Sequence, residues 1–224
     1  MRQIEISLDG ESLITPESIA AHMVAPGTRW KADELQNAKV ELGLMLNIAM
    51  QQFERGAEPQ QIIHRIAGSL HEARMRYEPS VWQQLIPIAQ QHPVASYFLQ
   101  DPFTRWSFTK PRGYSGDAQL LDFIYGHPSV ADEIANATPL GKALYDYTKD
   151  ASSSVAVRER RDLLTQHVDE IATSRGPGAE VLTIAAGHLR EANRSSALKE
   201  GRLKRWVALD QDPMSVGAIT RDFS

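Results

Sequence analysis

Two short groups of residues near the end of the chain have the types and spacing needed to bind a nucleoside. The first is a small-residue turn that follows an apolar run: Ala185, Ala186, Gly187 and His188. The second is the acidic end of another apolar run: Asp210 and Gln211. A small-residue turn lets a ligand approach the backbone, and a carboxylate at the end of the next strand can accept hydrogen bonds from both hydroxyls of a ribose. Gly187 and Asp210 are 23 residues apart, close to the roughly 20 residues typical of such a pair. We therefore expect a nucleoside or dinucleotide site.

The neighbouring sequence predicts the strands and helices that position these residues. Val181–Ala185 is a short apolar run ending at Gly187, as expected of a buried parallel strand that enters a tight turn. The dozen residues from Leu189 have helical composition and stop at Gly201, and Arg205–Leu209 forms a second apolar run. Asp212 and Pro213 then begin a last helix. The order predicted is strand, turn, helix, strand, helix.

The glycine content of the turn separates two classes of ligand. A pyrophosphate-binding loop needs the pattern G-x-G-x-x-G, whereas residues 185–189 contain the single glycine Gly187. This argues against a nicotinamide-dependent oxidoreductase and favours a ligand without phosphates.

The same residues carry a resemblance to a known family. The segment LTIAAGHLREA, followed by WVALDQDP, resembles motif I and the second-strand acid of class I S-adenosylmethionine-dependent methyltransferases. The resemblance implies that S-adenosylmethionine is the cofactor, that residues 183–189 pass under its methionine part and that Asp210 holds its ribose. Thr183, Ala185 and Leu189 depart from the family pattern, which usually has an acid, a glycine and a glycine there. An α/β unit without a ligand is the alternative.

A second loop is rich in reactive groups. Residues 110–117 read KPRGYSGD and contain the candidate substrate or lid residues Arg112, Gly113, Tyr114 and Asp117. Asp117 stands close to the N-cap of an amphipathic helix, so its carboxylate could simply bind the amides of the first turn. The loop is not a nucleophile elbow, because Asp117 stands where G-x-S-x-G needs its second glycine.

This loop extends the resemblance. KPRGYSGDAQLLDFIYG, and VAVRERRDLL from Val155 to Leu164, look like segments that precede the catalytic domain in bacterial methyltransferases with a helical N-terminal region. Some members of that group are implicated in making methyl esters of 3-hydroxy fatty acids. The resemblance implies that Arg112 orients an acidic substrate and that Tyr114 covers the sulfonium. A tight turn that packs Tyr114 into the helical region is the alternative. The charged residues at 158–162 are expected to form a solvated helix face. The alternative is that Arg158 or Arg161 extends into the cofactor cleft.

The first 150 residues are predicted to be mainly helical. Residues 4–8 alternate as an edge strand, and Thr15 with Pro16 begins a first helix. Apolar residues then recur at helical spacing from Lys31 to Phe53, after Pro59 and after Pro79. Such faces form a helical bundle, but a long amphipathic helix could equally support a homodimer.

Composition narrows the functional classes. The chain of 224 residues has a net charge of −4, which argues against nucleic acid or an anionic membrane as the main partner, and it has no cysteine. No run of about 18 apolar residues is present, and the first residues have neither the basic start nor the apolar stretch of a signal peptide, so we expect neither a membrane span nor a signal peptide. The histidines lack the spacing of a helical zinc site, so no metal is expected. Cytoplasmic localisation is the expectation.

Together these observations predict a mainly α chain: a helical N-terminal domain at 1–150, a connecting helix and linker at 151–178, and the first β-α-β-α portion of a Rossmann-like methyltransferase domain at 179–224. Because two strands cannot bury both faces of a sheet, we expect the catalytic domain to be truncated. The alternative is that the helical region or another copy of the chain covers the missing edge. The predicted function is S-adenosylmethionine-dependent methyl transfer to a small acidic or hydroxy-acid acceptor, by this chain or by a longer protein of which it is a fragment. The alternative is a non-catalytic helical dimerisation or regulatory module.

Overall fold

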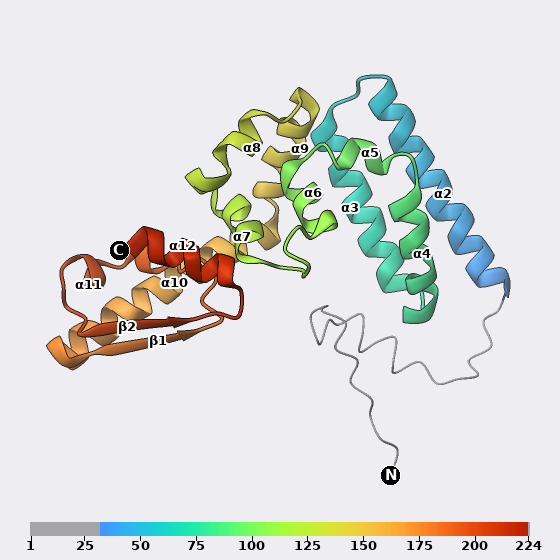
Figure 1. The fold of residues 1–224 in the computed structure, drawn as a ribbon. Coiled ribbons are helices and arrows are strands. Elements are labelled where there is room, and N and C mark those ends of the chain that lie inside the picture. The colour runs from blue at the N-terminus through green and yellow to red at the C-terminus, as the bar shows by residue number, and fades with distance from the viewer. Residues whose placement is uncertain (1–31, 224) are drawn as a thin grey trace, which may run out of the picture. The chain divides into compact units, whose positions relative to one another are not determined.

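The computed structural model describes residues 32–223, which are mainly helical and contain a small parallel sheet (Figure 1). The edge strand and the first helix expected within residues 1–30 lie outside this range. The longer helices are α2 (Ala32–Glu54), α3 (Pro59–Arg76), α4 (Pro79–Gln91), α9 (Pro139–Lys149), α10 (Ser152–Arg175) and α12 (Pro213–Phe223). The shorter helices are α5 (Ala95–Phe98), α6 (Pro102–Thr109), α7 (Ala118–Tyr125), α8 (Ala131–Ala135) and α11 (Ser196–Lys199). Single 3-10 turns lie at η1 (Pro128–Val130), η2 (Gly176–Gly178) and η3 (Ala192–Arg194), and the strands are β1 (Glu180–Ile184) and β2 (Arg205–Leu209).

The chain divides into two compact units. The first runs to Ser115 and includes Asp132–Thr148, whereas the second combines Gly116–Ala131 with Lys149–Ser224. The loop residues Arg112, Gly113 and Tyr114 therefore belong to the first unit. Asp117, the glycine turn and Asp210 belong to the second.

The first unit is organised around α2, α3 and α4, which the helical periodicity predicted. The buried positions of α2 are Ala38, Leu42, Leu46, Ala49 and Phe53, and they share one core with Ile62 and Ile66 of α3 and with Val81 and Leu85 of α4. A stripe of this kind must be covered by other apolar surfaces, and α3 and α4 both contact α2. The predicted bundle core is confirmed.

The second unit contains both predicted strands. β1 and β2 pair in parallel, with Leu182 opposite Val207 and Ile184 opposite Leu209. The last helix begins at Pro213, as predicted, because Asp212 caps it by accepting a hydrogen bond from the Met214 N–H at 2.9 Å. Within the described residues the sheet has these two strands alone.

The connection between the strands differs from the prediction. In place of one helix from about residue 189 to residue 200, the chain forms η3 and the single turn of α11. A carboxylate from α10 explains the break: Asp169 accepts hydrogen bonds from the Ser196 and Ala197 N–H groups, both at 3.0 Å. Asp169 and the Ser195 side chain therefore cap a new helix in the middle of the segment.

The two faces of the sheet have different surroundings. Trp206 and Ala208 point to the covered face and pack against a small core that includes Leu189 and Ile219. Because side chains alternate along a strand, the other face is formed by Leu182, Ile184, Val207 and Leu209. Leu182 is 60% exposed, Ile184 74% and Leu209 52%. None of the described helices is long and apolar enough to cross a membrane.

Candidate functional site

The glycine turn and the acid after β2 meet at the carboxyl ends of the two strands. The Gly187 N–H donates a hydrogen bond of 2.7 Å to Oδ2 of Asp210. The other carboxylate oxygen, Oδ1, accepts from the Asp212 N–H at 2.8 Å. The two predicted groups, 23 residues apart in the sequence, are therefore in direct contact. We call residues 185–190 together with Asp210 the turn site.

The turn has an unusual backbone. Ala185 has φ +56° and Leu189 has φ +51°, on either side of Gly187 at φ +55°. The left-handed region costs a residue with a Cβ about 1 kcal/mol or more, and such conformations concentrate at ligand sites. A Cβ at residue 187 would lie 3.2 Å from the Cβ of Ala118, so Gly187 allows both the positive φ and the close approach of α7. The turn is held in one conformation by its surroundings.

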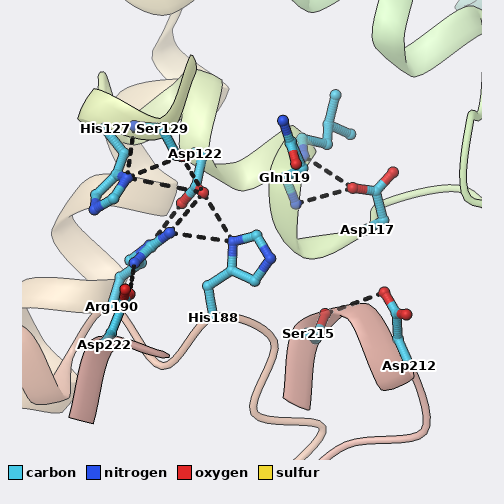
Figure 2. Close-up of polar contacts among 11 residues, drawn as sticks. Asp117, Gln119, Asp122, His127, Ser129, His188, Arg190, Asp212, Ser215 and Asp222 are labelled. Atoms are coloured by element: carbon cyan, nitrogen blue, oxygen red, sulfur yellow. Dashed lines mark hydrogen bonds and ion pairs between the residues drawn. The ribbon is translucent and has the colours of Figure 1, made fainter. Parts of the chain in front are cut away.

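A buried carboxylate on α7 provides much of that support (Figure 2). Asp122 is fully buried, and its Oδ1 and Oδ2 accept bidentate hydrogen bonds from Nε and Nη2 of Arg190, both at 2.8 Å. Oδ2 also accepts from Ser129 Oγ and is 2.8 Å from His188 Nδ1. Because an ionised carboxylate only accepts, Nδ1 of His188 carries the proton. Asp122 therefore joins α7 to two residues of the turn site.

The electrostatics of this cluster favour its charged form. Burial alone would raise the pKa of Asp122, but the hydrogen bonds from Arg190 and His188 and the Arg190 charge outweigh it and hold that pKa well below its usual range. Arg190 also pairs with Asp222 on α12 at 2.7 Å. The pKa of neighbouring His127 is lowered, first by burial and then by the Arg190 charge. The cluster is an ion-pair network that clamps the turn between α7 and α12.

A cavity of about 560 Å³ runs along β1 beside the turn site. Its lining includes β1 from Val181, the turn residues to Glu191, and Arg160 and Arg161 of α10. The Arg161 guanidinium lies 4.6 Å from the centre of the Tyr125 ring, which also lines the cavity. Burial raises the pKa of Glu191. A cavity of this size can hold a small organic ligand, and two guanidinium groups suit a carboxylate.

The remaining predicted residues have other positions. Asp117 is the N-cap of α7, accepting hydrogen bonds from the Gln119 and Leu120 N–H groups at 2.9 and 3.1 Å, as the simpler interpretation expected. Gln211 is exposed. Arg158 does not line the cavity; its guanidinium donates to the Ile124 carbonyl and pairs with Asp150. The roles of Arg112, Gly113 and Tyr114 as a lid stay a prediction.

Sequence reasoning missed Asp122 and Arg190. A signal existed, because Asp122 interrupts the apolar run Leu120–Ile124 of an amphipathic helix, and a carboxylate at such a position must find a cation or several donors. Its partners lie 66 and 68 residues away, however, and no local pattern identifies them. Within residues 32–223, no group of three or more metal-ligating side chains could hold an ion.

Comparison of the chain with protein-family models, with curated proteins and with solved structures gave no match. The function of the turn site is therefore argued from its geometry.

Proposed function

We propose that the second unit binds S-adenosylmethionine at the turn site and takes part in methyl transfer to a small acidic acceptor. The observation that carries the proposal is the 2.7 Å hydrogen bond between the Gly187 N–H and Asp210 Oδ2, which brings the turn after one parallel strand against the acid that ends the next. That arrangement suits a nucleoside whose ribose hydroxyls donate hydrogen bonds to the carboxylate. The single glycine favours a ligand without a pyrophosphate.

Two further features support the assignment. Ala185 and Leu189 are left-handed although each has a Cβ, and such conformations are common where a loop presents its backbone to a ligand. The cavity along β1 places Arg160 and Arg161 where they could pair with the carboxylate of an acceptor. Methyl transfer depends mostly on positioning of the two reactants, so an acid and base pair is not needed.

A non-catalytic interaction module is the second candidate function. It is favoured by the uncovered apolar face of the sheet, where Ile184 is 74% exposed, and by the replacement of a continuous helix after Gly187 with two short pieces. Cofactor binding distinguishes the two candidates, because the interaction module needs none.

Calorimetric titration of the full chain with S-adenosylhomocysteine tests the proposal. We expect micromolar binding, and at least tenfold weaker binding, about 1.4 kcal/mol, in Asp210→Asn, which keeps the size of the side chain and removes its charge. The matched control is Asp162→Asn on α10, whose carboxylate is 48% exposed and pairs with Arg161 and Arg194. Folding of each variant is checked by circular dichroism. Absence of binding by the folded wild-type chain, or equal affinity in Asp210→Asn, would exclude the proposed cofactor site.

A further inference from the structure

The cavity along β1 is lined by one acidic residue that the proposed function does not use. Glu191 follows the turn site directly, and its carbonyl accepts a hydrogen bond of 3.2 Å from Oγ1 of Thr165 on α10. The side chain of Glu191 is partly buried. Apart from its own backbone N–H, its carboxylate has no hydrogen-bond or ion-pair partner among residues 32–223. A partly buried carboxylate of this kind favours a ligand that supplies a positive charge.

The two arginines of the cavity leave this carboxylate unpaired. Burial raises the pKa of Glu191, and the charges of Arg160 and Arg161 offset that effect only in part. Arg161 is already paired with Asp162 at 2.9 Å and lies over the Tyr125 ring. Arg160 forms no ion pair within the described part of the chain. One negative and one positive side chain therefore line the same cavity without pairing with each other.

The same cavity also has an apolar surface. Leu164 of α10 and Leu182 and Ile184 of β1 contribute to its lining, and all three side chains are exposed. A ligand that covers them removes apolar area from water, which is the main favourable contribution to the binding of small organic molecules. The volume of about 560 Å³ is in the range of cavities that hold such ligands. The cavity therefore combines a cation, an anion and an aliphatic surface.

We propose that this cavity binds an α-amino acid with an aliphatic side chain. The carboxylate of the ligand pairs with Arg160, its ammonium group pairs with Glu191, and its side chain lies on Leu164, Leu182 and Ile184. A dicarboxylate would bring a second negative charge to Glu191, and a diamine would bring a second positive charge to Arg160, so the cavity discriminates against both. The role of this ligand as the methyl acceptor rests on the proposed function, whereas its binding to the cavity does not.

Calorimetric titration of the full chain with L-leucine, in the absence of cofactor, is the first test. We expect a dissociation constant between about 1 μM and about 1 mM. Three related compounds should bind at least tenfold more weakly, because each lacks one of the groups that the cavity recognises. They are 4-methylpentanoate, which has no amino group, 2-hydroxy-4-methylpentanoate, in which a hydroxyl replaces it, and glycine, which has no aliphatic side chain.

Charge-neutralising variants assign the two ends of the ligand. In Glu191→Gln the affinity for leucine should fall to that for 4-methylpentanoate, because the variant no longer pairs with the ammonium group. Arg160→Gln should weaken the binding of leucine at least tenfold. The matched control is Glu159→Gln, which changes an exposed residue outside the cavity and should bind leucine as the wild type does. Folding of each variant is checked by circular dichroism.

Two results with the wild-type chain alone would overturn the inference: no binding of leucine, or binding of 4-methylpentanoate or the hydroxy acid as tightly as leucine. A preference for leucine that persists in folded Glu191→Gln, unchanged affinity in Arg160→Gln, or an equal loss in Glu159→Gln would also overturn it. Titration with S-adenosylhomocysteine separates the two proposals. If S-adenosylhomocysteine binds and leucine does not, this inference alone fails, whereas the reverse result excludes only the proposed cofactor site.

Discussion

Asp122 shows how a single carboxylate can define the geometry of a site that it does not line. It accepts hydrogen bonds from Arg190, His188 and Ser129 in a position with no exposed surface. A buried charge of this kind is stable when every lone pair has a donor and a full opposite charge lies beside it. The carboxylate therefore fixes the side chains on both sides of Leu189, and through them the turn after β1.

Asp122→Asn should lower the free energy of unfolding by about 3–5 kcal/mol, because Arg190 keeps its charge in a buried environment and loses its ionic partner there. Urea denaturation followed by circular dichroism measures the change. Asp162→Asn, which removes a half-exposed carboxylate, should cost no more than about 1 kcal/mol. Similar losses in the two variants would show that the Asp122 network is not a strong clamp.

At the scale of elements, Asp169 decides how the segment between the strands folds. Its carboxylate accepts four hydrogen bonds from residues 195–197, which lie 26 to 28 positions later in the chain. Burial acts to raise the pKa of Asp169, but these hydrogen bonds outweigh it and lower the pKa to about 2. The helical composition after Leu189 is a local preference, and this long-range cap overrides it.

The lowered pKa predicts a dependence of stability on acid. Because the folded pKa lies below the ordinary value of 3.8, the contribution of Asp169 is complete above about pH 4 and is lost as the pH falls toward about pH 2. Asp169→Asn should therefore be less stable than the wild type at pH 5, with the difference shrinking toward pH 2. Urea midpoints at pH 5, 4, 3 and 2 measure it, with the neighbouring exposed residue changed in Glu170→Gln as control. A difference that is constant over this range would contradict the assignment.

At the scale of the whole molecule, the described residues leave two apolar surfaces uncovered, one on each unit. On α2, Val40 and Leu44 are 60% and 61% exposed. The sheet face of Leu182, Ile184 and Leu209 lies beside strand edges that are unpaired within the described part of the chain. Sheets of two strands are rarely stable in water without further packing, so we expect another apolar surface to pack on this face.

Exposure of the sheet face can be measured with a dye that binds apolar surface. Ile184→Thr should reduce the fluorescence of bound 1-anilinonaphthalene-8-sulfonate while changing the free energy of unfolding by less than about 1 kcal/mol, because the side chain is 74% exposed. The control is Leu144→Thr, a fully buried position in the first unit, which should be strongly destabilised. A large loss of stability in Ile184→Thr would mean that this face is covered in solution.

The sequence by itself determined the elements whose signals are local. The stripe of α2, the prolines that begin α3, α4 and α12, and the apolar runs of β1 and β2 all follow from periodicity and capping within one segment. It also predicted that Gly187 and Asp210 lie close together, because parallel strands bring their carboxyl ends to the same edge. Tertiary structure alone decided the pairing of Asp122 with Arg190, the break imposed by Asp169 and the choice of the sheet face that stays exposed. Those features depend on contacts between residues far apart in the sequence. Local sequence patterns do not predict such contacts or their free energies.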